Sequence, residues 1–309
     1  MKKLTALFLA LMLVISMVPM GSVCAEGETT ITILGTSDLH GNIWGFSYED
    51  NAETKNNGMA RVYTYIKQVR AENPNTILID DGDTIQGTIM TDDLFNKNPE
   101  REHPVIIAMN YMGYDAMVLG NHEFNWGIPS MKTILGRANF PMLCANVRTA
   151  DGELVTGKGW TIIEKAGVKV AIIGVVTPNV PIWDGGKEGI DECTYEAANT
   201  AVKAAIAEIG DAADLIVVAA HMGMYAEFDE EHGSDSAQKI LDDNPEINAM
   251  LVGHMHILVN EKQGDTVIGG PRNGGRDVVR FDITVGSDKS IVDAKVDVID
   301  MKDTEPAQE

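Results

Sequence analysis

Five of the seven histidines in this chain lie in short polar clusters, each close behind an apolar run. The clusters combine His with Asp or Asn, whose nitrogen and oxygen atoms are ordinary ligands of divalent metals. The candidate ligands are Asp38, His40, Asp83, Asn121, His221, His254 and His256. Cysteine is absent from this set, so it suits Mn, Fe, Zn or Mg rather than a metal selected by thiolate. The joint occurrence of the clusters, more than any one of them, predicts a metal centre.

The spacing inside the clusters indicates how two ions could be held. Asp38 and His40 are two residues apart, so on extended backbone both side chains point to the same side and can hold one ion. His254 and His256 share that spacing. Two ions about 3.5–4 Å apart need one ligand that touches both, and a carboxylate has two oxygens for this role. Asp83 is the expected bridging ligand.

The apolar runs before the clusters have the length and composition of β-strands. They are Thr30–Ser37, Thr76–Asp80, Ala116–Leu119, Asp214–Ala220 and Ile247–Val252. Open α/β sheets form ligand sites just beyond the carboxyl ends of their strands. We therefore expect loops from several strands to build a single site.

Helical and strand patterns alternate through most of the chain. Apolar residues recur at helical spacing from Met59 to Val69 and within Thr194–Ile209, and the continuous apolar run Val168–Val176 fits a strand buried on both faces. From Val279 to Val298, apolar and polar residues alternate as in antiparallel strands. The pattern predicts an α/β domain with two sheets flanked by helices.

The charge balance limits the class of partner. The formal net charge is −22 at pH 7. Such a surface repels polyanions, which argues against binding to DNA, RNA or an anionic membrane. A small anionic substrate remains compatible, because bound metal would supply local positive charge.

The first residues have the order of a secretory signal peptide. Lys2 and Lys3 precede the apolar run Leu4–Val18, and small residues lead to Ala25. We expect residues 1–25 to be removed, giving a secreted protein, whether extracellular, periplasmic or at the cell surface, with no stable membrane insertion. An uncleaved anchor is less favoured because the run is short for a bilayer.

Residues 26–302 are expected to form one compact domain, followed by a polar tail at 303–309. The tail has no apolar partner evident in the sequence, so disorder or the start of a linker to a further domain are the two interpretations. Export permits a disulfide between Cys144 and Cys193, but two cysteines make no framework. Free thiols are the favoured interpretation, and pairing stays open.

The clusters with their flanking residues resemble the motif series of the calcineurin-like metallophosphoesterases. The matching segments are Asp38–Asn42, Gly82–Gly87, Gly120–Phe124, His221–Gly223 and Gly253–His256. Within that family they are most similar to the secreted 5′-nucleotidase and 2′,3′-cyclic-nucleotide phosphodiesterase group. The resemblance spans Ile31 to Val298, so residues 26–302 would be the catalytic domain. It implies a four-layer α/β/β/α sandwich.

The resemblance also implies residue roles. One ion would be held by Asp38, His40, Asp83 and His256, and the other by Asp83, Asn121, His221 and His254. His122 would lie off the metals and would either stabilise the developing charge or protonate the leaving group. From their positions beside the candidate ligands, we expect Glu123 and Phe124 to pack and support the loop, and Asp80 and Asp81 to cap the turn or support the ligands.

One departure bears on the substrate. Related 5′-nucleotidases usually carry Asp where this chain has Asn125, whereas the cyclic-nucleotide branch commonly carries Asn. Asn can hydrogen-bond the histidine but cannot offset its charge. The resemblance therefore favours 2′,3′-cyclic-nucleotide phosphodiesterase activity, with 3′-nucleotidase activity as a second expectation and 5′-nucleotidase or UDP-sugar hydrolase as alternatives.

A second departure concerns nucleoside selectivity. Related enzymes continue into a carboxy-terminal domain that stacks the nucleobase between aromatics, whereas this sequence ends at Glu309, as a fragment, a short paralogue or a split gene product would. Aromatic residues make up 6% of the chain, and no evident base clamp is visible among them. Discrimination among bases should be weak. The alternative from another class is a non-enzymatic secreted metal-binding or adhesion module, which would not need His122.

Overall fold

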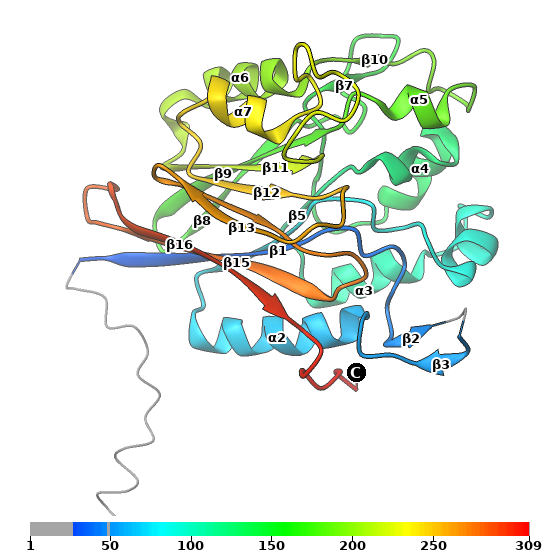
Figure 1. Ribbon diagram of the computed structural model, residues 1–309, viewed down its shortest axis with the longest axis horizontal. Helices are drawn as coiled ribbons and strands as arrows, with labels where there is room; N and C mark the ends of the chain where they lie inside the picture. Colours follow the sequence, from blue (N-terminus) through cyan, green and yellow to red (C-terminus); the bar gives the residue numbers. More distant parts are fainter. Residues whose placement is uncertain (1–26, 48–49, 309) are drawn as a thin grey trace, which may run out of the picture.

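The computed structural model describes residues 27–47 and 50–308. Two six-stranded sheets lie face to face, and helices cover their outer sides (Figure 1). Helices α2 and α3 lie against the first sheet, while α6 and α7 lie against the second (Figure 1). This arrangement confirms the expected four-layer α/β/β/α sandwich.

The first sheet contains the early strands and the last two. In spatial order these are β16 (Ile291–Asp300), β15 (Asp277–Val285), β1 (Thr29–Thr36), β4 (Thr76–Asp80), β5 (Ala116–Val118) and β6 (Met142–Leu143). Strands β1, β4, β5 and β6 run parallel, and β15 and β16 are antiparallel, as the alternating pattern predicted.

The second sheet comes from the middle of the chain. In spatial order its strands are β13 (Val259–Gln263), β14 (Thr266–Gly270), β12 (Ala249–Val252), β11 (Leu215–His221), β9 (Val168–Val176) and β8 (Trp160–Lys165). Strands β9, β11, β12 and β14 run parallel. The carboxyl ends of the parallel strands in each sheet therefore meet at one edge, where ligand sites of α/β sheets form.

The helices and short elements complete the fold. The α-helices are α2 (Met59–Glu72), α3 (Pro104–Met112), α4 (Gly127–Leu135), α5 (Val180–Asp184), α6 (Ala198–Ile209) and α7 (Ala237–Asp243). The short π-helix η1 (Met90–Asn96) and the 3-10 helices η2 (Asn121–Phe124) and η3 (Gly210–Ala212) lie between them. Two short ribbons pair β2 (Phe46–Ser47) with β3 (Ala52–Glu53) and β7 (Val147–Arg148) with β10 (Thr194–Tyr195). The helix expected within Thr194–Ile209 starts only at Ala198, because the first two residues pair as β10.

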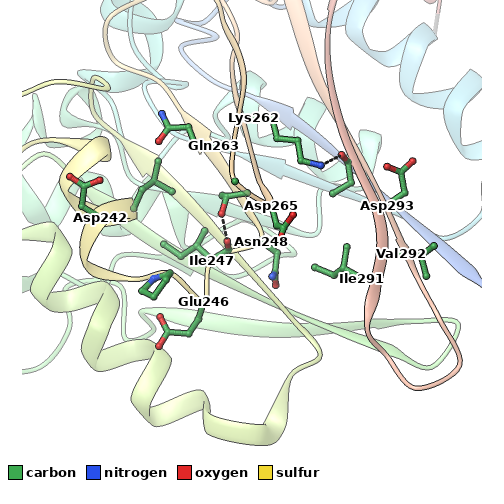
Figure 2. A pocket seen from close by; sticks show the side chains of 15 residues that line it. Asp242, Glu246, Ile247, Asn248, Lys262, Gln263, Asp265, Ile291, Val292 and Asp293 are labelled. Atoms are coloured by element: carbon green, nitrogen blue, oxygen red, sulfur yellow. Dashed lines mark hydrogen bonds between the residues drawn. The ribbon is translucent and has the colours of Figure 1, made fainter.

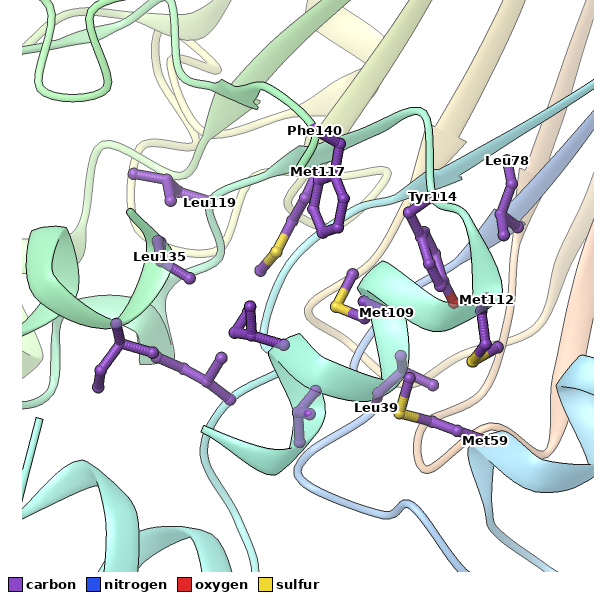
Figure 3. Packing of buried hydrophobic residues seen from close by; sticks show 14 of the residues in the cluster. Leu39, Met59, Leu78, Met109, Met112, Tyr114, Met117, Leu119, Leu135 and Phe140 are labelled. Carbon is purple, nitrogen blue, oxygen red and sulfur yellow. The ribbon is translucent and has the colours of Figure 1, made fainter. Parts of the chain in front are cut away.

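Apolar residues on both faces of the central strands hold the layers together. In β1, Ile33 faces the second sheet and Leu34 faces the helices, so one strand contributes to two cores. In the helix-facing core, Leu39 lies beside Met59 of α2, and methionines from α3 and β5 belong to the same cluster (Figure 3). Leu39 lies between Asp38 and His40 and is fully buried. The core therefore fixes the loop that carries two predicted ligands.

The end of the described chain is more ordered than expected. Ala307 is buried, and its backbone N–H donates to the carbonyl of Ala60 on α2, while the Arg61 guanidinium donates to the carbonyl of Thr304. The expectation that the tail has no apolar partner is wrong for Ala307, because the α2 surface supplies one. The expected signal peptide lies outside the described residues. Within those residues, every helix is too short or too polar to cross a bilayer.

Candidate metal centre

The first group of predicted ligands comes from the loops after β1 and β12. Ligand atoms of Asp38, His40 and His256 all lie within 4.8 Å of one another. Nε2 of His256 is 3.2 Å from Oδ1 of Asp38 and 3.0 Å from Nε2 of His40. Within the described residues, Oδ1 of Asp38 is buried and accepts no hydrogen bond. A buried carboxylate oxygen facing two imidazole nitrogens suits a cation.

The second group comes from the loops after β4, β5 and β12 and from the last residue of β11. Ligand atoms of Asp83, His221 and His254 also lie within 4.8 Å of one another. Nε2 of His221 is 3.1 Å from Oδ2 of Asp83, and Nδ1 of His254 is 2.8 Å from Oδ1 of Asn121. Nε2 of the fully buried His221 has no hydrogen-bond partner in the described part of the chain. The structure thus brings all seven predicted ligands together in two adjoining groups.

The outward nitrogens of three imidazoles are held by hydrogen bonds. Nδ1 of His40 is 3.1 Å from the carbonyl oxygen of Gln86, and Nδ1 of His221 lies against the carbonyl oxygen of Asp81. Nε2 of His254 is 2.9 Å from Oε2 of Glu227. Such partners take the N–H of the ring and leave the other nitrogen unprotonated toward the site. The ring orientations are therefore set before any ion binds.

Unusual backbone geometry is concentrated at the site. Eight non-glycine residues in the described chain have positive φ, and five of them are predicted ligands. These five are Asp38, His40, Asp83, His254 and His256, with φ between 47° and 70°. Left-handed backbone is costly for residues with a Cβ and persists where the surrounding structure enforces it. The left-handed backbone at these residues changes the direction of each loop, so that the ligand side chains converge.

Close backbone packing allows the loops to meet. A Cβ on Gly120 would collide with Oδ1 of Asp83, so only glycine fits there. The buried carboxylate of Glu123 accepts from the backbone N–H groups of Asp83 and Thr84, each at 2.8 Å, and from that of Gly120 at 2.7 Å. Glu123 therefore joins the loops after β4 and β5, in line with its expected supporting role.

The neighbouring acids differ in their contacts. Asp80 accepts from the hydroxyls of Thr36 and Thr84, both at 2.6 Å, and burial raises its pKa to about 7. It supports the turn, as expected. Asp81 contributes its carbonyl to His221, while its carboxyl oxygens have no hydrogen-bond partner among the described residues.

His122 lies between the two groups without belonging to either. Its ring is 5.4 Å from that of His40, its Nε2 is 3.9 Å from Oδ2 of Asp83, and its side chain is 36% exposed. Nδ1 of His122 is 2.8 Å from Oδ1 of Asn125. The amide nitrogen of Asn125 donates to the buried Asp184 on α5 at 3.1 and 3.2 Å. Asp184 thereby orients the amide so that its oxygen accepts the Nδ1 proton, and Nε2 lies on the side of Asp83.

The electrostatics of the site keep the two predicted ligand carboxylates, Asp38 and Asp83, ionised. Burial acts to raise the pKa of Asp38, but the adjacent imidazoles of His256 and His221 outweigh it and lower that pKa. Burial likewise opposes ionisation of Asp83, yet His221 lowers the pKa of Asp83 far below its usual value. Burial lowers the pKa of His254, so this imidazole is neutral and ready to act as a ligand at neutral pH.

Two contributors to the site were not anticipated from the sequence. Asp184 and Glu227 hold Asn125 and His254, but both lie in segments with no recognisable motif. No spacing rule links them to their partners, which are 59 and 27 residues away. Only the fold places these pairs in contact.

A separate pocket of about 650 Å³ lies near the amino end of β12, away from the predicted ligands at its carboxyl end. Its rim carries Asp242, Glu246, Asp265 and Asp293, while Lys262 donates to a backbone carbonyl of β16 (Figure 2). This acidic rim does not favour a phosphate ester. Cys144 and Cys193, which belong to or pack against the helix-facing core of the first sheet, are free thiols, as favoured from the sequence.

Comparison with known protein families supports the same chemistry. A family model described as calcineurin-like phosphoesterase matches residues 31–258. The chain is 33% identical to the trifunctional nucleotide phosphoesterase protein YfkN of Bacillus subtilis over 76% of its own length. It is 32% identical to a 2′,3′-cyclic-nucleotide 2′-phosphodiesterase/3′-nucleotidase of Salmonella typhimurium over 79% of its length. It spans 17% and 40% of those two relatives, respectively.

Solved structures give the same picture. The crystal structure of calcineurin-like phosphoesterase YfkN from Bacillus subtilis superposes with a TM-score of 0.82 at 27% identity, covering 91% of this chain and 94% of that one. A 5′-nucleotidase precursor from Thermus thermophilus shares the fold, with a TM-score of 0.72 at 20% identity over 90% of this chain and 56% of that one.

Proposed function

We propose that this chain, which belongs to the calcineurin-like phosphoesterase family, hydrolyses nucleotide phosphoesters at two divalent metal ions and prefers 2′,3′-cyclic nucleotides. The observation that carries the proposal is the convergence of two ligand groups beside a histidine that belongs to neither. A metal-binding or adhesion module would need the groups but not that histidine. Hydrolysis of a phosphoester would use both the ligand groups and His122.

The donor atoms suit two metal ions. In this assignment Asp38, His40 and His256 hold one ion, while His221, His254 and Asn121 hold the other. Asp83 is the proposed bridge, because its carboxylate lies in the second group and its backbone carbonyl accepts from the N–H of His40 in the first at 2.9 Å. A buried carboxylate oxygen of Asp38 and a buried imidazole nitrogen of His221 have no hydrogen-bond partner among residues 27–47 and 50–308, and such atoms suit hard or borderline cations such as Mn, Fe, Zn or Mg.

His122, Asn125 and Asp184 would each have a separate role in cleavage of the ester. Bound divalent ions supply Lewis acidity and a water of lowered pKa. With both ring nitrogens protonated, His122 would keep its Nδ1–H on the Asn125 oxygen and give its Nε2 proton to the leaving oxygen, which leaves the neutral Nδ1–H ring. Asp184 fixes the amide of Asn125 and so the ring of His122. The exposed edge of His122 is where the leaving group departs.

Glu227→Gln should weaken metal binding without removing a ligand. Glu227 accepts from His254 Nε2, which keeps Nδ1 free for the metal, whereas a glutamine amide can rotate and donate instead. Loss of such a partner typically costs about 10–100-fold in metal affinity. Competition with a fluorescent chelator measures the affinity of each variant. Unchanged affinity in Glu227→Gln would show that the contact does not orient His254.

The substrate preference can be tested with a nucleotide panel in Mn²⁺. We expect hydrolysis of 2′,3′-cyclic AMP, CMP, GMP and UMP with similar KM values and slower turnover of 5′-AMP, because Asn125 leaves the charge of protonated His122 unbalanced. Initial rates from phosphate and nucleoside monophosphate release give kcat/KM for each compound. Preference for 5′-AMP over every cyclic substrate would shift the assignment to 5′-nucleotidase, and loss of all hydrolysis would leave the non-enzymatic alternative. Secretion, which depends on the leader expected at residues 1–25, is part of the same proposal.

A further inference from the structure

Two aromatic side chains far apart in sequence meet beside the second ligand group. The rings of Trp183 and Phe228 lie 5.6 Å apart at an interplanar angle of 67°. Trp183 also lies 5.5 Å from the ring of His254. Their exposed fractions are 39% and 50%, so both rings present surface to solvent directly beside the metal centre.

The loop that carries Phe228 is held in place rather than free. The buried carboxylate of Asp235 accepts from the backbone N–H groups of Glu227 and Phe228 at 3.2 and 2.9 Å and from the amide of Asn179 at 2.6 Å. Asn179 immediately precedes α5, which carries Trp183. One carboxylate thus ties both aromatic segments together and fixes the spacing of the two rings.

Helix α5 also places the aromatic pair on the leaving-group side of the site. Trp183 contacts His254, whereas its neighbour Asp184 binds Asn125, the partner of His122. The indole therefore contacts a predicted metal ligand, and the next residue on the same helix supports the histidine assigned to the leaving oxygen. A nucleoside leaving the phosphate would extend along this face.

We propose that Trp183 and Phe228 form a stacking platform for the nucleobase of the substrate within this domain. The inference rests on the proposed function, because it assumes a phosphoester at the metal centre. A planar, uncharged base suits exposed ring faces and edges, and it avoids the repulsion that the nearby carboxylate of Glu227 would impose on an anion. Stacking accepts every base, so the platform should raise affinity for nucleotides without choosing among them.

The test compares the full chain with Trp183→Leu on two esters in Mn²⁺. One is 2′,3′-cyclic AMP, and the other is the 2′,3′-cyclic phosphate of 1-O-methyl ribose, which lacks the base. We expect Trp183→Leu to raise KM for the nucleotide roughly five- to fiftyfold, in the range of lost stacking contacts, with KM for the base-free ester and the metal content unchanged. Phe228→Leu should act in the same direction. Tyr111→Leu, which removes an exposed ring from α3, should change neither value.

Ring-current shifts provide a readout that needs no turnover. In proton–nitrogen NMR spectra, the indole signal of Trp183 should move on titration with AMP but not with ribose 5-phosphate. An indole signal that responds to neither compound, or a parallel rise in KM for both esters in Trp183→Leu, would overturn the platform. If the wild type hydrolysed neither ester while the indole still responded to AMP, the platform would stand and the proposed function would fail.

Discussion

Asp83→Ala should lose both metal ions and nearly all activity, where the wild type binds about two equivalents of Mn²⁺ or Zn²⁺. Oδ2 of Asp83 lies 3.1 Å from Nε2 of His221, and Oδ1 accepts from the backbone N–H of His122 at 2.7 Å. Removing this buried carboxylate leaves the imidazoles without their shared anion and frees the loop after β5. Because the ions contribute several kcal/mol of charge stabilisation, kcat/KM should fall by at least about 10³-fold. Elemental analysis after metal loading and gel filtration measures the loss.

The matched control removes a carboxylate of the same type elsewhere. Asp265→Ala takes an exposed aspartate from the acidic pocket near the amino end of β12 (Figure 2) and should keep full metal content. Asp83→Asn, which preserves the size of the side chain, separates the loss of charge from a defect in folding. An Asp83→Ala protein with full metal content and activity would exclude Asp83 as the bridge.

His122→Ala should keep both ions while kcat falls roughly 10²–10⁴-fold, the range for general acid–base groups. The side chain belongs to neither ligand group, and its Nε2 is free to face the leaving oxygen. A leaving group of low pKa needs no proton, so the defect should shrink on a nitrophenyl ester. Steady-state rates on nitrophenyl and alkyl esters, together with metal analysis, measure both effects.

The two readouts distinguish the roles of His122. An equal loss on activated and alkyl esters would mean that His122 acts only by stabilising charge. Loss of a metal ion in His122→Ala would place the ring among the ligands instead. In either case the hydrogen bonds from His122 to Asn125 and from Asn125 to Asp184 would still orient the ring, but they would not serve proton transfer to the leaving group.

The convergence of the candidate ligands could be predicted from the sequence because it depends on local order. Each candidate follows a strand, and parallel strands bring their carboxyl ends to one edge whatever the details of packing. The sandwich was equally predictable, since strands such as β9 are apolar on both faces and β15 alternates. These signals lie within single segments, so they need no knowledge of distant contacts.

The partners of the ligands required the tertiary structure. Asp184 reaches Asn125 and Glu227 reaches His254 across loops whose sequences carry no pattern, and Trp183 meets Phe228 from a different segment. The sequence shows no evident base clamp, because the two rings are separated by elements that only the second sheet and its helices bring together. Hydrogen bonds and ring contacts between loops depend on where each loop is anchored, and buried residues such as Asp235 and Leu39 set those anchors. The identity of the candidate ligands could therefore be read from the sequence. The orientation of their side chains and the pairing of Trp183 with Phe228 depend on tertiary packing.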